Sequence, residues 1–416
     1  MSYSLILLSI LLPLGLLASE KSDEYLKDLQ PKVIKYSDSE SVTIPTAPFQ
    51  VKLTEEDAPQ IYQSQKIPWS SWWYPNNSKE FFEDYSIVDQ VLGEINFRPS
   101  LRVYDSIFNR KGDKSTLEYL KPFYDGNSSP WEGACTLWAL ASVYYEQPSE
   151  KTYCYYLEDK KLKDGRVVNE FGRYKLNDNS NSDEVQYCED KKGGEVLFPG
   201  HAKSLLALSF SPLSDSAYFF DDYLLGQHNR GSGYLDINDI YPHEFLQGLI
   251  FQLGKNNFPA IMDYDMGEAI WNHPIYKLEL YVRKKDEQTA KVTMKVFFKT
   301  PLQIGESAGL RYKDMLGPLA LTDGEIPKVY TAELYGSFSG DTFVLNHQLK
   351  REEKSSWVGQ SISSHPDTLM LPPPMSLSEL VELNVQKRAE LRMDDSFGGD
   401  IDSEVWLDRL LKVIDL

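Results

Sequence analysis

The hydrophobic period of this chain changes at Gly254, and this change restricts the fold more than any other feature of the sequence. Before Gly254, apolar residues recur with helical spacing in three segments, residues 135–145, 201–208 and 242–253. After it, residues 275–282 alternate between apolar and polar, and residues 292–298 repeat the pattern beyond a charged turn, which predicts an antiparallel hairpin. Helices followed by such a sheet predict an α+β fold.

Further elements follow from the same two periods. Short apolar runs bounded by turn residues predict strands at residues 258–264, 329–335, 342–350 and 356–360. Helical spacing predicts one helix early in the chain and two in the tail, at residues 86–92, 376–391 and 402–414.

The N-terminus has the composition of an export signal. Residues 1–19 hold an apolar run that ends in small residues and is followed by charged ones, although no Lys or Arg precedes it. No later segment has the roughly 18 consecutive apolar residues of a membrane span, so no integral membrane segment is expected after cleavage. We expect a secreted or periplasmic protein in an oxidising compartment.

Composition divides the remaining chain into three parts. Residues 20–65 are acidic and interrupted by proline, which predicts an extended arm or a pro-segment. Residues 66–373 hold the main apolar runs and the motifs that follow, so the principal domain is expected there. Residues 374–416 come after a proline-rich stop and are expected to form a helical tail.

The charge and the aromatic content restrict the partners. The net charge of −19 argues against nucleic acid or an anionic membrane surface as a binding partner. Aromatic residues make up 13% of the chain, which suits either a cleft for extended polymers or an aromatic core.

Cys135 is the main candidate for a chemical role. It opens a helical run directly after a stretch rich in helix breakers, and the positive end of a helix dipole favours the nucleophilic thiolate. The alternative is a small buried apolar residue, because free cysteine is often buried. Cys154 and Cys188 lie in similar settings, and a bridge between them would leave Cys135 as the odd thiol.

A helix with a cysteine near its start, followed by an antiparallel sheet, is the order of a papain-like core. In such a core a histidine at the start of a strand meets the nucleophilic cysteine. His273 fits this position, and imidazole can take the thiol proton and later protonate a leaving amine. His201, at another helix start, is the competing base. Asp263 is the first choice to orient the ring, with Asn272 and Asp265 behind it.

Metal chemistry finds little support in the sequence. No His or Cys pair has the spacing of zinc ligands. Two oxygen-rich runs, residues 177–184 and 236–239, have ligands suited to calcium, but neither is an EF-hand loop and solvated turns are the simpler interpretation. No cofactor is therefore required.

The run Glu268–Tyr276 resembles the V-W-N-Q-P-V elicitor motif of the Phytophthora-type transglutaminases, a family also found in bacteria, and Trp271, Asn272 and Pro274 match it. Other family-like stretches follow in the expected order, at residues 68–75, 131–139, 198–206, 236–242 and 364–367. Together they cover about residues 66–373 and favour a bacterial member of this family.

The resemblance implies protein-glutamine γ-glutamyltransferase activity on a papain-related core, with Cys135 as nucleophile and calcium dependence in some members. The substrates would be a protein glutamine donor and a lysine or polyamine acceptor. Two departures concern the base, because His273 stands where the oomycete motif has Gln and His201 stands where an acidic residue is expected.

In this mechanism Trp131, Trp138, Trp271 and Asn272 would line the substrate slot and exclude water. Two rival functions remain open. A papain-like cysteine protease or amidase would use the same nucleophile with water as the acceptor. A non-catalytic secreted binding protein would have no need for an activated thiol.

Overall fold

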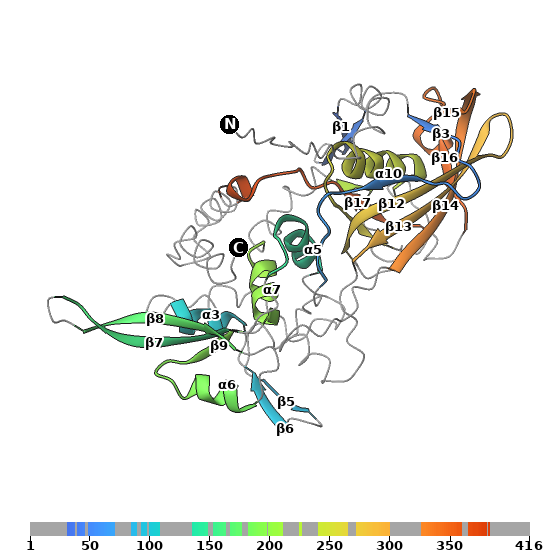
Figure 1. The fold of residues 1–416 in the computed structure, drawn as a ribbon. Helices are drawn as coiled ribbons and strands as arrows, with labels where there is room; N and C mark the ends of the chain where they lie inside the picture. The colour runs from blue at the N-terminus through green and yellow to red at the C-terminus, as the bar shows by residue number, and fades with distance from the viewer. Residues whose placement is uncertain are drawn as a thin grey trace, which may run out of the picture.

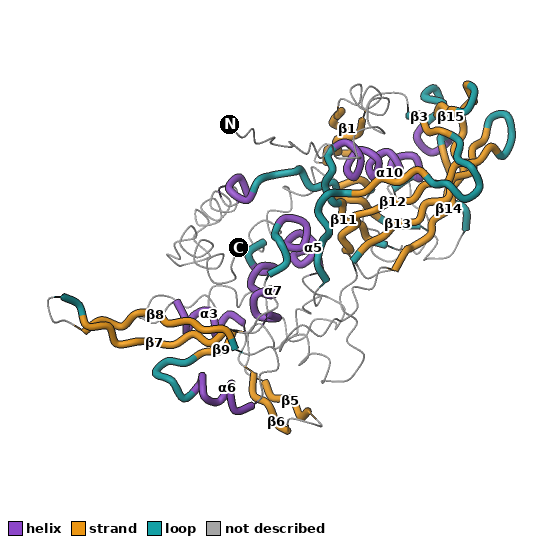
Figure 2. Tube along the Cα trace, viewed as in Figure 1, coloured by secondary structure: helices purple, strands orange, loops and turns teal. Residues whose placement is uncertain are grey.

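The computed structural model shows a large antiparallel sheet with helices against it and a smaller β-hairpin lobe beside them (Figures 1 and 2). It describes residues 31–37, 40–45, 49–70, 85–89, 93–97, 100–108, 135–148, 153–163, 167–176, 182–197, 199–210, 224–226, 240–264, 272–299, 326–359, 365–380 and 382. The fold is α+β, as the change of period predicted.

The main sheet is antiparallel throughout its described strands. Its central path, in spatial order, is β10 (Leu224–Leu225), β17 (Thr368–Met370), β11 (Ala260–Asp263), β12 (Asn272–Lys284), β13 (Thr289–Phe298), β14 (Ile326–Ser339), β15 (Thr342–Leu345) and β3 (Gln50–Lys52). Two further strands attach to it, β4 (Gln60–Gln63) on β12 and β16 (Ser355–Trp357) on β14.

The hairpin of β12 and β13 confirms the alternating pattern in the sequence. Leu278, Leu280 and Val282 are buried, whereas the intervening Lys277 and Glu279 lie on the other face and form an ion pair of 2.8 Å. Successive side chains of a strand point to opposite faces, so the apolar half of each strand enters the core. A register shift between Ile275 and Lys277 reverses this parity, so Ile275 shares the core with Leu278, and the faces of residues 272–275 follow from their pairing with β11.

Two apolar cores lie on opposite sides of β11 and β17. One core joins α3 (Ser100–Phe108), α5 (Cys135–Tyr144) and α7 (Pro199–Leu208), and it includes Ile261 and Met370. The other lies under α10 (Pro242–Leu249) and its π-helical continuation η2 (Ile250–Lys255), and it includes Met262 and Leu369. The two strands therefore alternate between the cores, and the face that carries Ile261 and Met370 looks toward α5.

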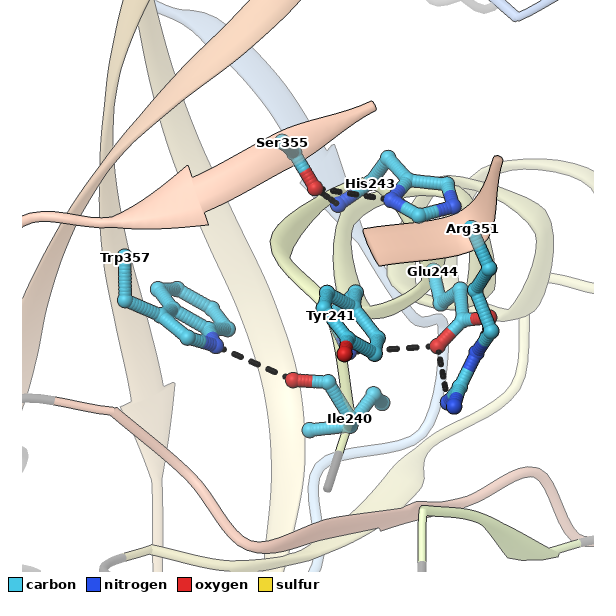
Figure 3. A network of polar contacts seen from close by, with 7 residues as sticks. All are labelled: Ile240, Tyr241, His243, Glu244, Arg351, Ser355 and Trp357. Carbon is cyan, nitrogen blue, oxygen red and sulfur yellow. Dashed lines mark hydrogen bonds and ion pairs between the residues drawn. The ribbon is translucent and has the colours of Figure 1, made fainter. Parts of the chain in front are cut away.

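The α10 helix is held at its N-terminus by a polar network. Figure 3 shows its seven members, which are Ile240, Tyr241, His243, Glu244, Arg351, Ser355 and Trp357. The Tyr241 backbone N–H donates to the Glu244 carboxylate (3.1 Å), and Arg351 of the short 3₁₀ helix η3 (Arg351–Glu353) pairs with the same carboxylate at 2.6 and 2.8 Å. Glu244 thus caps its own helix and joins it to the segment before β16.

The smaller lobe is a three-stranded sheet in the order β8 (Val167–Lys175), β7 (Tyr153–Lys161) and β9 (Glu195–Leu197), with α6 (Ser182–Glu189) beside it. A disulfide between Cys154 on β7 and Cys188 on α6 closes a separation of 34 residues. The predicted bridge is confirmed, and Cys135 is the free cysteine.

Two sheet pairs occupy the earlier part of the chain. One pair joins β1 (Pro31–Ser37) and β2 (Glu40–Pro45), and the other joins β5 (Tyr85–Asp89) and β6 (Gly93–Phe97). The helix predicted at residues 86–92 is therefore wrong. Ile87 and Val88 are β-branched and favour the extended conformation, and β6 supplies a partner strand that local spacing does not reveal.

The N-terminal arm contributes to the main sheet. β3 pairs with β15 and β4 pairs with β12, and both strands come from within the segment predicted as an arm or pro-segment. A cleaved pro-segment would have to take these two strands with it. The predicted signal at residues 1–19 lies outside the described residues, and the described part of the tail includes helical residues 377–380.

Candidate active site

Cys135 is the first residue of α5, as the sequence predicted. The helix packs against α7, β11 and β12, and most of its residues, from Trp138 to Tyr144, are buried around its whole circumference. A helix that is apolar on all sides belongs in a core, so it is a rigid support for its first residue. The backbone N–H groups of its first turn have no partner within the helix and point toward the thiol end.

Strand register brings three polar residues to the face that meets α5. Asn272 on β12 lies opposite Asp263 on β11, and Asp263 lies opposite Thr368 on β17. Directly opposed residues of antiparallel strands point to the same face. Since Ile261 and Met370 on that face pack in the core with α5, the row Asn272–Asp263–Thr368 also faces the α5 side.

Interactions with the first turn of α5 agree with this placement for two members of the row. The Asn272 side-chain amide donates to the Thr136 hydroxyl (2.6 Å), and its backbone N–H hydrogen-bonds the Cys135 thiol. The Asp263 carboxylate acts electrostatically on the same thiol. Cys135, Thr136, Asn272 and Asp263 therefore form one cluster.

Opposing effects set the pKa of the Cys135 thiol. Burial is the largest and raises the pKa, because the side chain is only 6% exposed and the thiolate would lose its hydration. The Asn272 N–H lowers the pKa, the negative charge of Asp263 raises it, and the Thr136 hydroxyl and N–H lower it. The net pKa is raised, so the thiol is protonated in the closed site and needs a proton acceptor to become a nucleophile.

His273 follows Asn272 on β12, so its side chain belongs to the opposite face of the strand. Its ring packs against Tyr264 and Phe298, with ring centres 4.9 and 5.0 Å apart, and its Nδ1 lies 3.2 Å from the Lys299 carbonyl oxygen. Burial lowers the pKa of His273 to about 4, partly offset by the Lys299 carbonyl. The ring is therefore neutral near pH 7.

Two other predicted site residues, His201 and Trp138, are buried on helices. His201 is buried on α7, a helix that packs on α5. Trp138 is fully buried on α5, where its indole N–H donates to the Trp69 carbonyl (3.2 Å) and its ring lies edge-on to His273 at 6.5 Å. Trp131 and Trp271 lie outside the described residues.

Two residues near Cys135 were missed in the sequence, one in the cluster and one in the row of polar residues that faces α5. Thr136 directly follows Cys135 and was available as a candidate. Thr368 follows the family-like stretch at residues 364–367, but only the pairing of β11 with β17 brings it to the site.

The described residues hold no group of three or more His, Cys, Asp or Glu arranged to bind a metal ion. Most of the two oxygen-rich runs considered for calcium lies outside them. No described helix has both the length and the apolar composition needed to cross a membrane.

Comparison with known proteins gives one structural likeness. No family model matches the sequence, and no curated protein matches it. The structure is similar to the crystal structure of the GP42 transglutaminase from Phytophthora sojae, with a TM-score of 0.42 and 12% identity over 81% of this chain and 94% of that chain. A TM-score and identity this low do not establish a shared fold or activity.

Proposed function

We propose that this protein is a secreted cysteine acyltransferase of the protein-glutamine γ-glutamyltransferase type, with Cys135 as its nucleophile. The observation that carries the proposal is the position of the free Cys135 at the first residue of a core helix, with the Asn272 N–H on its sulfur and the Asp263 carboxylate on the facing strand. The disulfide between Cys154 and Cys188 supports an oxidising location outside the cytoplasm.

In the first step, the Cys135 sulfur would attack the carbonyl carbon of a glutamine γ-carboxamide. The new C–S bond forms, the C–N bond breaks, and ammonia leaves with the proton that the thiol gave up. The backbone N–H groups at the start of α5 are suited to stabilise the oxyanion that forms on the carbonyl. A lysine or polyamine nitrogen then attacks the thioester, and the thiol is restored.

We assign Asp263 the role of acceptor of the thiol proton, because its carboxylate lies on the strand that faces α5 and acts electrostatically on the thiol. Its negative charge opposes the thiolate, so a proton moving from sulfur to this carboxylate removes that repulsion. The His273 ring instead packs against Tyr264, and its Nδ1 lies at the Lys299 carbonyl oxygen. The His273 ring is neutral near pH 7 and packs against aromatic side chains. It is therefore well suited to support the strand that carries Asn272.

The rival hydrolase would use the same Cys135 thioester with water as acceptor. Burial of Cys135 and Asp263 limits the access of water, and the ratio of ammonia released to amine incorporated separates transfer from hydrolysis. A binding protein without catalysis is the second rival, and it predicts that loss of the thiol changes nothing but packing.

The test is amine incorporation. Purified protein is incubated with a blocked glutaminyl peptide and a fluorescent primary amine, and both incorporated amine and released ammonia are measured. We expect wild-type protein to incorporate the amine and Cys135→Ala to incorporate none while melting at a similar temperature. His273→Gln and His201→Gln test the two imidazoles, and each should retain more activity than Asp263→Ala.

Ammonia released without amine incorporation would assign the protein to the amidases. Absence of both products in correctly folded wild-type protein would favour the binding protein. Undiminished activity of Cys135→Ala would contradict the proposed nucleophile.

A further inference from the structure

Thr368 is the least explained polar residue near Cys135. It is 1% exposed, and its hydroxyl has no hydrogen-bond partner among the described residues. A buried hydroxyl without a partner destabilises a fold, and valine has nearly the same shape without that penalty. Strand formation therefore gives no reason for a threonine at this position rather than a valine.

The register of the sheet aims Thr368 at the site. Its Cα partner across β11 and β17 is Asp263, and the backbone N–H of Asp367 beside it donates to the Asp263 carbonyl (3.2 Å). Met370, two residues further along the same strand, packs in the α5 core. The Thr368 side chain therefore lies on the α5 side, next to the carboxylate that acts on Cys135.

Asp263 and Thr368 together offer hydrogen-bond acceptors at neighbouring positions, and the threonine adds one donor. A carboxylate beside a hydroxyl matches a nitrogen that carries two or three hydrogens, such as a primary amide or a primary ammonium. At the Asn272 end of the row, the side-chain amide already donates to the Thr136 hydroxyl, and the backbone N–H donates to the thiol. At the Thr368 end, the hydroxyl has no hydrogen-bond partner among the described residues, so this end of the row has unused hydrogen-bonding capacity.

We propose that Asp263 and Thr368 form the nitrogen subsite of this protein, which holds the departing ammonia and then the incoming primary amine. The proposal rests on the function proposed above. The nitrogen that leaves the acyl carbon and the nitrogen that enters occupy the same side of that carbon, because aminolysis retraces the path of acylation.

The proton balance is complete with these groups. In acylation, the Cys135 proton passes to Asp263 and from there to the departing nitrogen as the C–N bond breaks. In transfer, the amine must be uncharged to attack, so an entering ammonium first loses one proton to solvent. It then gives a second proton to Asp263 as the new C–N bond forms, and the C–S bond breaks. The proton on Asp263 returns to sulfur, and Thr368 holds the nitrogen by a hydrogen bond throughout.

The experiment compares Thr368→Val with Thr368→Ser, since serine keeps the hydroxyl. We expect Thr368→Val to melt at or above the wild-type temperature while amine incorporation falls about 10–100-fold in kcat/KM, the value of one hydrogen bond to a polar or charged partner. The ratio of ammonia released to amine incorporated should rise. Thr368→Ser should restore most of both properties.

A matched control is Thr289→Val, a buried threonine at the start of β13. It should leave the ratio of ammonia to incorporated amine unchanged. The subsite is refuted if Thr368→Val keeps both the wild-type rate and the wild-type ratio. It is also refuted if Thr368→Val melts many degrees lower and Thr368→Ser restores only the stability, because threonine would then be structural.

A second readout separates this proposal from the function on which it rests. Wild-type protein that forms neither product contradicts acyl transfer, yet Cys135 can still be alkylated. Iodoacetamide carries a primary amide, whereas methyl methanethiosulfonate has none. Thr368→Val should slow alkylation by iodoacetamide relative to the second reagent, and an unchanged ratio of the two rates would refute the subsite by itself.

Discussion

The ion pair between Glu244 and Arg351 allows the sharpest test of how the main sheet holds its helix (Figure 3). Arg351 contacts the Glu244 carboxylate at 2.6 and 2.8 Å and stacks over the Tyr241 ring at 4.5 Å. The two side chains differ in exposure, since Glu244 is 4% exposed and Arg351 is 26% exposed. The two halves of the pair should therefore respond differently to mutation.

Arg351→Met leaves a buried carboxylate without its cation, and breaking a buried pair in this way costs about 3–5 kcal/mol. Glu244→Gln removes the charge but keeps an acceptor for the Tyr241 N–H, and the remaining arginine can reach water. We expect this change to cost about 1–2 kcal/mol. The double variant should be more stable than Arg351→Met alone, because it no longer has a buried carboxylate without its cation.

Urea denaturation followed by tryptophan fluorescence measures these free energies, with equal m-values as the control for a comparable transition. The expected coupling is about 1–3 kcal/mol between neighbours in one network. Additive effects of Arg351→Met and Glu244→Gln would refute the reasoning. A cost below about 1 kcal/mol for Arg351→Met would do the same, since such a value is typical of an exposed pair.

Three further predictions concern covalent and titrating groups. Replacing both Cys154 and Cys188 by serine should cost about 4 kcal/mol of unfolding free energy, from the loop of 34 residues, as measured by denaturation with and without the bridge. Asp263→Asn should lower the pKa of the Cys135 thiol, because a charge that raises it is removed, and the alkylation profile should move to lower pH. The folded-state pKa of His273 is lowered to about 4, so stability should be lost as pH falls from the unfolded value of about 6.5; His273→Gln should lose about 2–3 kcal/mol less than wild type between about pH 7 and pH 4.5. An alkylation profile that does not move would contradict the effect of Asp263 on the pKa of the Cys135 thiol. Equal acid sensitivity of His273→Gln and wild type would contradict the lowered pKa of His273.

The parts of the fold with a strong local pattern could be predicted from the sequence. Helices that begin near Cys135 and Pro242, and the hairpin of β12 and β13, appear as expected because periodic burial dictates them. The helical spacing at residues 86–92 was misleading, because pairing of β5 with β6 decided the conformation of residues 85–89.

The site was predictable only in part, because its geometry depends on register. The sequence identified Cys135, Asp263 and Asn272, and the structure brings these three together. The side chain of His273 belongs to the other face of β12, because one step along a strand reverses the face, and its Nδ1 lies at the Lys299 carbonyl oxygen. Thr368 lies about 100 residues beyond Asp263 along the chain and is joined to it only by strand pairing, which no local pattern reveals.

The measurement that tests the central claim most directly is the mass of the acylated protein. Protein is mixed with a glutamine donor peptide in the absence of amine, quenched in acid, and examined as intact protein and after peptide mapping. The account predicts an added mass equal to the donor less one ammonia, located on Cys135, absent from Cys135→Ala and removed by a later addition of amine. An active protein that carries no adduct on Cys135, or an adduct that persists in Cys135→Ala, would contradict it.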